Sequence, residues 1–235
     1  PYVATGFMFI AGLPQSLLAM MLLQGRIMPM IKDPQPRVYL LIALVLSLVI
    51  VAYHEIVVDP RIFETAAHAF KDALFNIISV MTGTGYASAP YDTWGEPVMA
   101  IFLVATFVGG CAGSAACGLK MFRLEISAKA IVAYSHRMTM PHRRTPIRYG
   151  GKVVDEETLQ SVMVFVFLYL ATFLVAAALL SLCGLDAMTA ISGSATSVSN
   201  VGPGLGPIIG PSGTFQTLPD AAKWICAIAM LLGRL

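Results

Sequence analysis

The chain has 235 residues, of which 57% are hydrophobic and only 12% are charged, and its formal net charge is +2. Soluble domains carry about 25% charged residues, so a chain of this composition cannot cover its surface with polar side chains. The composition predicts an integral membrane protein and excludes the soluble, disordered and nucleic-acid-binding classes, while the small net charge indicates no partner.

Five apolar stretches are candidate membrane spans, because a helix needs about 20 apolar residues to cross a bilayer. They are residues 1–25, 38–58, 97–119, 158–185 and 220–235. The chain starts and stops inside two of these stretches, at Pro1 and Leu235. We therefore expect the sequence to be a piece of a longer protein.

Two further helical segments, residues 66–81 and 186–198, are too short to span. At 1.5 Å per residue they reach only about 24 and 20 Å, against a hydrocarbon core of about 30 Å. Each leads into a glycine-containing stretch, TGTGYASAP at 82–90 and SNVGPGLGP at 199–207.

The charges predict the topology of the first short segment. Residues 26–37 carry three Lys/Arg and one acid, and residues 120–152 carry eight Lys/Arg and one acid. Residues 54–96 carry two Lys/Arg and six Asp/Glu. By the positive-inside rule both basic loops are cytoplasmic, so an even number of spans separates them. Residues 66–81 must then enter and leave on the outer side, as a re-entrant pore helix.

The second half of the chain repeats this order of elements, with a span at 158–184, a short helix, a Gly-rich loop and a span from 220. Matching Asp72 to Asp186 gives an offset of 114 residues, whereas matching Gly85 to Gly202 gives 117. The order of elements is better evidence for a repeat than either alignment.

The Gly-rich loops are candidate ion sites. Non-helical backbone at membrane depth is tolerated where it lines a water-filled cavity, and its carbonyl oxygens can replace the hydration shell of a cation. The stretch Thr82–Tyr86 has this character, and Ser199–Gly202 is its partner, each after a short helix whose negative C-terminal end points toward the ion. The alternative for each loop is an ordinary turn outside the membrane.

A run of small residues at 109–118 has two interpretations. It is either a site of close helix packing or a helix broken inside the membrane, with a flexible loop that obstructs the pore. Arg234 lies about 21 Å deeper than Asp220 if the last helix is continuous. It either faces the pore as a functional group or extends to the cytoplasmic interface.

Several segments together resemble the Trk/Ktr/HKT superfamily of potassium transporters, most closely its bacterial TrkH type. They are FMFIAG (7–12), DALFNIISVMTGTGYAS (72–88), FVGGCAGSAACGLK (107–120), GGKVV (150–154), SNVGPGLG (199–206) and AAKWICAIAMLLGRL (221–235). They cover nearly the whole chain in the order found in that family, and we regard the combination as highly specific.

The resemblance implies an all-α integral membrane fold built from potassium-channel-like repeats of span, re-entrant pore helix, filter loop and span. Four such repeats surround one pore in the family. The expected domains are the last helix of a preceding repeat (1–25), a cytoplasmic loop (26–37), the third repeat (38–119), a basic cytoplasmic linker (120–157) and a truncated fourth repeat (158–235).

The resemblance also implies the site residues. The residues expected to bind K⁺ in the selectivity filter are Thr82, Gly83, Thr84, Gly85, Ser199, Asn200, Val201 and Gly202. The residues expected to form the gate below the filter are Gly109, Gly110, Gly113, Ser114, Ala115, Ala116, Cys117, Gly118 and Arg234. We expect K⁺ as the transported ion, with no organic cofactor, no other metal site and no catalytic residue.

The implied setting is a multi-pass protein of the bacterial inner membrane that forms homodimers, contacts lipid and does not bind nucleic acid. A cytoplasmic nucleotide-binding subunit of the TrkA/KtrA kind is the expected regulator, and the basic linker is one candidate contact. The charge of that linker is equally explained by topology alone. K⁺ and mixed K⁺/Na⁺ selectivity both stay open, as do passive and ion-coupled transport.

Two segments depart from the family pattern. Its gate loop usually reads Gly-Ser-Thr-Gly-Gly-Gly, whereas residues 113–118 read GSAACG, and Ala and Cys tolerate fewer backbone conformations than Gly. Gly83 stands where Thr is common. We expect a less flexible loop and a looser filter site.

Two other classes of function are alternatives. One is a substrate-coupled secondary transporter of another fold, with broken helices that bind a small molecule at the midplane. The other is an intramembrane enzyme, which we rank last because none of the four histidines lies within a span beside a nucleophile.

Overall fold

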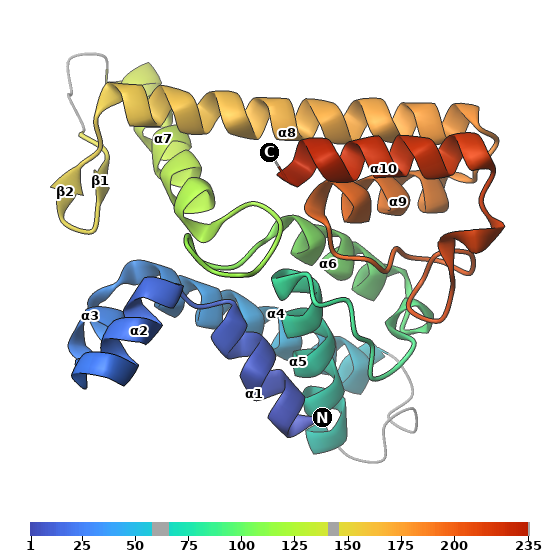
Figure 1. The fold of residues 1–235 in the computed structure, drawn as a ribbon, viewed down its shortest axis with the longest axis horizontal. Helices are drawn as coiled ribbons and strands as arrows, with labels where there is room; N and C mark the ends of the chain where they lie inside the picture. Colours follow the sequence, from blue (N-terminus) through green and yellow to red (C-terminus); the bar gives the residue numbers. More distant parts are fainter. Residues whose placement is uncertain (58–65, 141–145, 235) are drawn as a thin grey trace.

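The computed structural model describes residues 1–57, 66–140 and 146–234, which are predominantly helical (Figure 1). The helices are α1 (Tyr2–Ala11), α2 (Gln15–Gln24), α3 (Met28–Lys32), α4 (Pro34–Val57), α5 (Ala66–Thr82), α6 (Glu96–Phe107), α7 (Met121–Thr139), α8 (Glu156–Leu182), α9 (Ala187–Ser199) and α10 (Asp220–Arg234). Short 3₁₀ turns lie at η2 (Tyr91–Thr93) and η3 (Phe215–Thr217), and β1 (Arg148–Tyr149) pairs with β2 (Lys152–Val153). The predicted all-α fold class is confirmed. The ends of two predicted spans, Val58 and Leu235, and part of the basic linker, residues 141–145, lie outside the described residues.

Two of the predicted spans form helices of spanning length. By length and composition, α4 with 24 residues and α8 with 27 residues can cross a membrane. The expected spans were residues 38–58 and 158–185; α4 covers the first up to Val57, and α8 ends at Leu182, three residues before the predicted end of the second. The two predicted short helices are also present. Helix α5 corresponds to the prediction at 66–81 and α9 to the prediction at 186–198, and their ends differ from the predicted ones by at most one residue.

Residues 1–25 do not form the single helix that we expected. They form α1 and α2, which meet at an angle of 105°. Pro14 explains the break, because proline has no N–H to donate and disfavours a helical conformation in the residue before it. The assignment of this segment to a preceding repeat stays a prediction.

The expected span at 97–119 is likewise shorter than predicted. Its helix, α6, ends at Phe107 after 12 residues, about 18 Å, and residues 108–120 continue without a helix. This decides between the two interpretations of the small residues in favour of a broken helix. The last helix, α10, is also short, with 15 described residues or about 22 Å.

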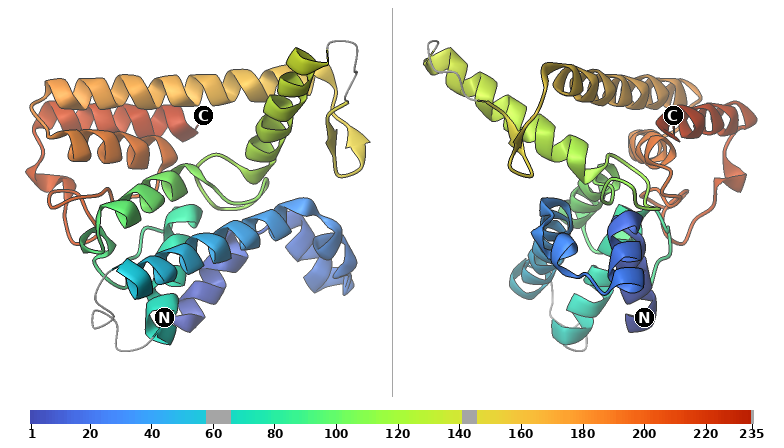
Figure 2. Two further views of the ribbon diagram at one scale, coloured as in Figure 1. Left: turned by 180° about the vertical axis from the view of Figure 1, so that it is seen from behind. Right: turned by 60° about the vertical axis from the view of Figure 1, so that its left-hand side comes forward.

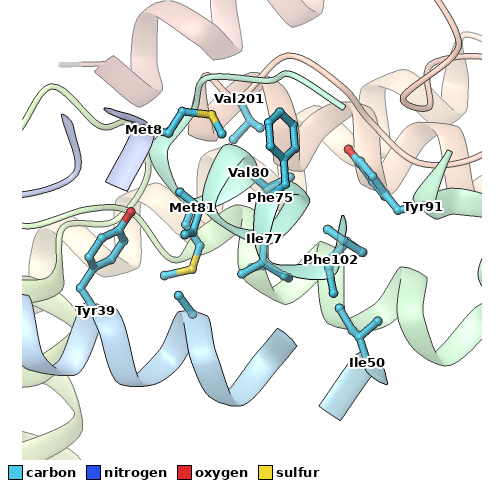
Figure 3. Packing of buried hydrophobic residues seen from close by; sticks show 14 of the residues in the cluster. Met8, Tyr39, Ile50, Phe75, Ile77, Val80, Met81, Tyr91, Phe102 and Val201 are labelled. Carbon is cyan, nitrogen blue, oxygen red and sulfur yellow. The ribbon is translucent and has the colours of Figure 1, made fainter. Parts of the chain in front are cut away.

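The two short helices belong to two separate groups of helices (Figures 1 and 2). Helix α5 packs against α1, α4 and α6, while α9 packs against both α8 and α10, which also contact each other. Contacts between α6 and α9 join the groups. In Figure 3, Val201, which follows α9, lies among core side chains around α5, including Val80 and Met8. The ends of α5 and α9 are thereby brought to one place.

The start of α9 is stabilised by Asp186, whose side chain accepts a hydrogen bond of 3.1 Å from the Thr189 backbone N–H. We expect Asp186→Ala to lower the free energy of unfolding by about 1 kcal/mol, the usual cost of losing such a cap, and Asp186→Asn to cost much less. Thermal loss of helical circular dichroism in detergent measures this. As a control, Asp220→Ala removes a carboxylate that is 92% exposed and pairs with Lys223, and it should change stability less. Equal effects of Asp186→Ala and Asp220→Ala would contradict the capping role.

Candidate functional site

The loops that follow α5 and α9 fold back onto their helices with the same hydrogen bonds. After α5, Gly83 donates from its N–H to the Val80 carbonyl at 3.1 Å, and Thr84 donates to Ser79 at 3.0 Å. After α9, Asn200 donates to Ser197 at 3.1 Å, and Val201 donates to Thr196 at 3.0 Å. The donors and acceptors correspond at an offset of 117 residues. The structure therefore supports the alignment of Gly85 with Gly202 over the alternative offset of 114.

The two loops also share an alternation of backbone conformation. Gly83 and Gly85 have φ of 71° and 75°, and Asn200 and Gly202 have φ of 55° and 117°. Among the described residues other than glycine, Asn200 alone has positive φ, so Thr84 and Val201 have negative φ. A backbone that alternates between positive and negative φ can turn successive carbonyl oxygens toward one side, as a carbonyl ion site requires.

The two loops lie against each other. A Cβ built on Gly85 would lie 2.6 Å from the Val201 carbonyl oxygen and 3.1 Å from Pro203 Cδ. A Cβ on Gly83 would lie 3.2 Å from the Asn200 carbonyl oxygen. The structure thus brings together the residues predicted at 82–85 and 199–202, and it leaves no room for a side chain at Gly85.

Behind the first loop lies a polar network that the sequence analysis missed. Asn76 on α5 accepts a hydrogen bond of 3.0 Å from the Ser88 backbone N–H, and its amide donates to Ser88 Oγ at 3.2 Å. Ser88 Oγ in turn donates to Asp72 Oδ1 at 3.1 Å. The signal was present in the sequence, because Asp72 and Asn76 are polar residues four apart on one face of an apolar helix.

We expect Asn76→Leu to loosen the first loop, because it removes both hydrogen bonds between Asn76 and Ser88, each of which contributes about 0.5–1.5 kcal/mol. The predicted result is a severalfold loss of K⁺ preference over Na⁺ in tracer competition, measured on the protein with its native flanking sequence. Thr93→Ala is the control, since the Thr93 hydroxyl donates to the nearby Pro90 carbonyl at an exposed turn. Unchanged competition in Asn76→Leu would show that the network does not support the loop.

Residues 108–119, which we call the small-residue loop, leave the end of α6 and return to the start of α7. The loop is closed at its base, where Gly109 donates to the Leu119 carbonyl at 2.9 Å and Leu119 donates to Phe107 at 3.1 Å. A Cβ on Gly109 would overlap the Cys117 carbonyl oxygen, so the two sides of the loop can approach this closely only with glycine at 109.

The small-residue loop contacts the ends of both short helices. Cys117 donates from its N–H to the Thr82 carbonyl at 3.2 Å, and Gly118 donates to the Ser199 carbonyl at 3.1 Å. These carbonyls are at the C-terminal ends of α5 and α9. Carbonyl groups in the last turn of a helix have no N–H partner within that helix. One loop therefore caps both helices.

On its other side the small-residue loop rests on the break between α1 and α2. Cys111 donates to the Gly12 carbonyl at 2.9 Å, Ala115 donates to Ala11 at 3.2 Å, and Gln15 donates to Gly113 at 3.0 Å. The break in the first segment, which sequence analysis did not predict, thus supplies acceptors and a donor for the loop.

The structure places all the predicted loop residues together in this loop: Gly109, Gly110, Gly113, Ser114, Ala115, Ala116, Cys117 and Gly118. The gate-loop residues that depart from the family pattern lie at positions whose backbone conformation does not require glycine. Gly113 and Gly118 each have φ of 72°, whereas Ala115, Ala116 and Cys117 are not among the residues with positive φ. The glycines are retained at the two left-handed positions.

Arg234, at the end of α10, contacts the small-residue loop directly. Its Nη1 lies 3.1 Å from Cys117 Sγ. Both residues line a cavity of about 290 Å³ that also includes Lys120, Arg123 and Asn200. Of the described residues that line this cavity, three are cationic and none is acidic, so a cation leaving the loop region would meet positive charge.

Comparison with known proteins gives a consistent set of matches. A family model described as TrkH, Cation transport protein, matches residues 31–235. The Trk system potassium uptake protein TrkI of Halomonas elongata is 38% identical over 229 residues, 97% of this chain and 45% of that protein. The Trk system potassium uptake protein TrkG of Escherichia coli is 30% identical over 234 residues, 99% of this chain and 47% of that protein.

A solved structure matches as well. The crystal structure of the potassium transporter TrkH from Vibrio parahaemolyticus superposes with a TM-score of 0.88 at 28% identity, and the match covers 98% of this chain and 48% of that chain. The chain therefore spans about half the length of the relatives that it matches.

Proposed function

Because the chain belongs to the TrkH family of cation transport proteins, we propose that it forms part of a pathway for potassium uptake across a membrane. The observation that carries this proposal is the matched pair of loops after α5 and α9, which share hydrogen bonds and backbone alternation and lie in contact. Relatives that match nearly the whole chain are named as potassium uptake proteins.

The ion site is proposed at the backbone carbonyl oxygens of residues 82–85 and 199–202. A dehydrated K⁺ needs several neutral oxygen ligands, and closely packed loops of alternating backbone conformation offer them without side-chain ligands. The C-terminal ends of α5 and α9 add negative potential at this place. The chemistry is binding and release of K⁺, with no covalent step and no organic cofactor.

The gate is proposed in the small-residue loop together with Arg234. The loop lies across the ends of both short helices, and the Arg234 guanidinium contacts its Cys117. In this position the loop and the adjacent cationic cavity oppose the passage of K⁺. Opening requires the Cys117 and Gly118 N–H groups to leave the Thr82 and Ser199 carbonyls.

The setting proposed for the chain is the bacterial inner membrane, which it crosses more than once in contact with lipid. Its relatives are named as components of a Trk system, which supports a multi-component assembly. We propose a homodimer with a cytoplasmic nucleotide-binding subunit. Helix α7 and the β1–β2 hairpin project from the body in Figure 2 and carry basic residues such as Lys129 and Lys152, which makes them candidate contacts.

A growth experiment tests the proposed function. The protein, expressed with the sequence that flanks this chain in its gene, is introduced into bacteria that lack their own potassium uptake systems. We expect growth to be restored at low external K⁺, and cellular K⁺ measured by flame photometry to rise. Expression in the membrane without either effect would contradict the proposal.

A further inference from the structure

We infer that Lys120 is the positioning residue of the small-residue loop: its ammonium group occupies a cradle of loop oxygen atoms and keeps the loop on the ends of α5 and α9. The inference rests on the proposed function and extends it, because it assigns what holds the gate closed. Lys120 immediately follows the loop, at the N-cap of α7.

The cradle consists of three neutral oxygen atoms. Lys120 Nζ lies 3.2 Å from the Ser114 carbonyl oxygen and 3.4 Å from Ser114 Oγ, and it also donates to the Ala116 carbonyl oxygen. An ammonium group has three N–H donors, so this set can satisfy it completely. Ser114 Oγ donates onward to the Cys111 carbonyl at 2.6 Å. One side chain thus ties residues 111–116 into a single turn.

The tied turn ends where the loop meets the short helices. Ala116, whose carbonyl binds the ammonium, is followed at once by Cys117 and Gly118, whose N–H groups donate to the helix ends. The chain from 117 to 119 is therefore held at both ends, by the cradle and by the Lys120 backbone. Loss of the ammonium group weakens the first of these attachments, which then depends on the bond from the Ala115 N–H to the Ala11 carbonyl.

The other two cations of the cavity are engaged differently. The Arg123 guanidinium carbon lies 3.7 Å from the centre of the Phe165 ring, and Arg234 contacts the Cys117 thiol. Among the described cations that line this cavity, Lys120 is the one that binds loop carbonyl groups. Arg123 is therefore a matched control for the charge of the cavity.

A thiol-labelling experiment tests this inference. The protein, with its native flanking sequence, is prepared with Cys117 as its sole cysteine, and its reaction with a neutral maleimide is followed in inside-out vesicles beside K⁺ flux. We expect Lys120→Ala to raise the labelling rate about tenfold, the factor that corresponds to losing one charge-assisted hydrogen bond. Arg123→Ala should change the rate less than Lys120→Ala does, because the Arg123 guanidinium packs on the Phe165 ring and binds no loop carbonyl group.

Chemical rescue separates the ammonium group from general packing. Propylammonium replaces the side-chain atoms that Lys120→Ala removes, so adding it should return the labelling rate toward that of the parent protein. If Lys120→Ala fails to fold, Lys120→Gln keeps a polar side chain that is shorter than lysine and removes the charge, and it should also raise labelling. Unchanged labelling in the folded lysine variants, or a rate that propylammonium does not alter, would overturn the inference.

The result is also distinguishable from failure of the proposed function. If labelling rises and is rescued while K⁺ flux is absent from every variant and from the parent protein, Lys120 positions the loop but the transport proposal fails. If K⁺ flux is present and labelling is the same with and without the ammonium group, transport stands and the role of Lys120 is rejected.

Discussion

Replacing Gly85 with serine is expected to reduce the preference of transport for K⁺ over Na⁺ by about tenfold, since overpacking at a close contact costs about 1–3 kcal/mol. A Cβ at this position would lie 2.6 Å from the Val201 carbonyl oxygen, which is itself a proposed ligand. Gly85 also has φ of 75°, which residues with a Cβ resist. The substitution therefore displaces carbonyl oxygens of both loops and changes the distances between the proposed ligands of K⁺.

Gly202→Ser is the matched comparison, because Gly202 is the counterpart of Gly85 in the second loop. It has φ of 117°, but no described atom lies within 4 Å of the Cβ that a substitution would add. We expect it to weaken K⁺ preference through backbone strain alone, and thus less than Gly85→Ser. Competition between labelled K⁺ and Na⁺ in proteoliposomes measures both. Equal preference in Gly85→Ser and the parent protein would reject the filter assignment.

Shortening the small-residue loop within residues 112–117 is expected to raise K⁺ flux about tenfold or more. The change disturbs the hydrogen bonds from the loop to the Thr82 and Ser199 carbonyls, and each such bond stabilises by about 1 kcal/mol. Without these hydrogen bonds the closed position of the loop is less stable relative to the open one, so the path below the two helix ends stays open for longer. Flux of K⁺ into liposomes, normalised to the amount of inserted protein, is the measurement.

Arg234→Gln provides an independent test of the same gate. It removes the charge that contacts Cys117 while keeping a shorter polar side chain, so we expect flux to rise, though less than on shortening the loop. Lys223→Gln on the same helix is the control, since its ammonium pairs with the exposed Asp220 at the far end. Flux that stays at the parent level in both the shortened loop and Arg234→Gln would reject the gate.

The sequence predicted the helices whose signals are local. The fold class could be predicted from three local features. They are the scarcity of charged residues, the long apolar stretches that form α4 and α8, and the short lengths of α5 and α9. The break in residues 1–25 was missed, although Pro14 and Gly12 mark it, because an uncharged segment of 25 residues has the length of one span. The composition of this segment indicates how hydrophobic it is, but not whether it forms one continuous helix.

The structure brings the predicted candidate-site residues together, and the sequence analysis did not predict the hydrogen bonds that connect them. The loops after α5 and α9 were identified from their glycines, whereas the register between them required the paired hydrogen bonds of Thr84 and Val201. The contacts of Cys117 and Gly118 with both helix ends join positions that are far apart in sequence, and no local pattern encodes them. The same holds for the Lys120 cradle, since a basic residue at the end of a span is first explained by topology.

The most direct test of potassium conduction is the reversal potential of the protein, with its native flanking sequence, in a planar bilayer under opposed K⁺ and Na⁺ gradients. We expect a current that reverses near the K⁺ equilibrium potential. Current that reverses near zero would contradict a K⁺-selective site. Saturable uptake of a small substrate with no ionic current would contradict conduction altogether and favour a substrate-coupled transporter.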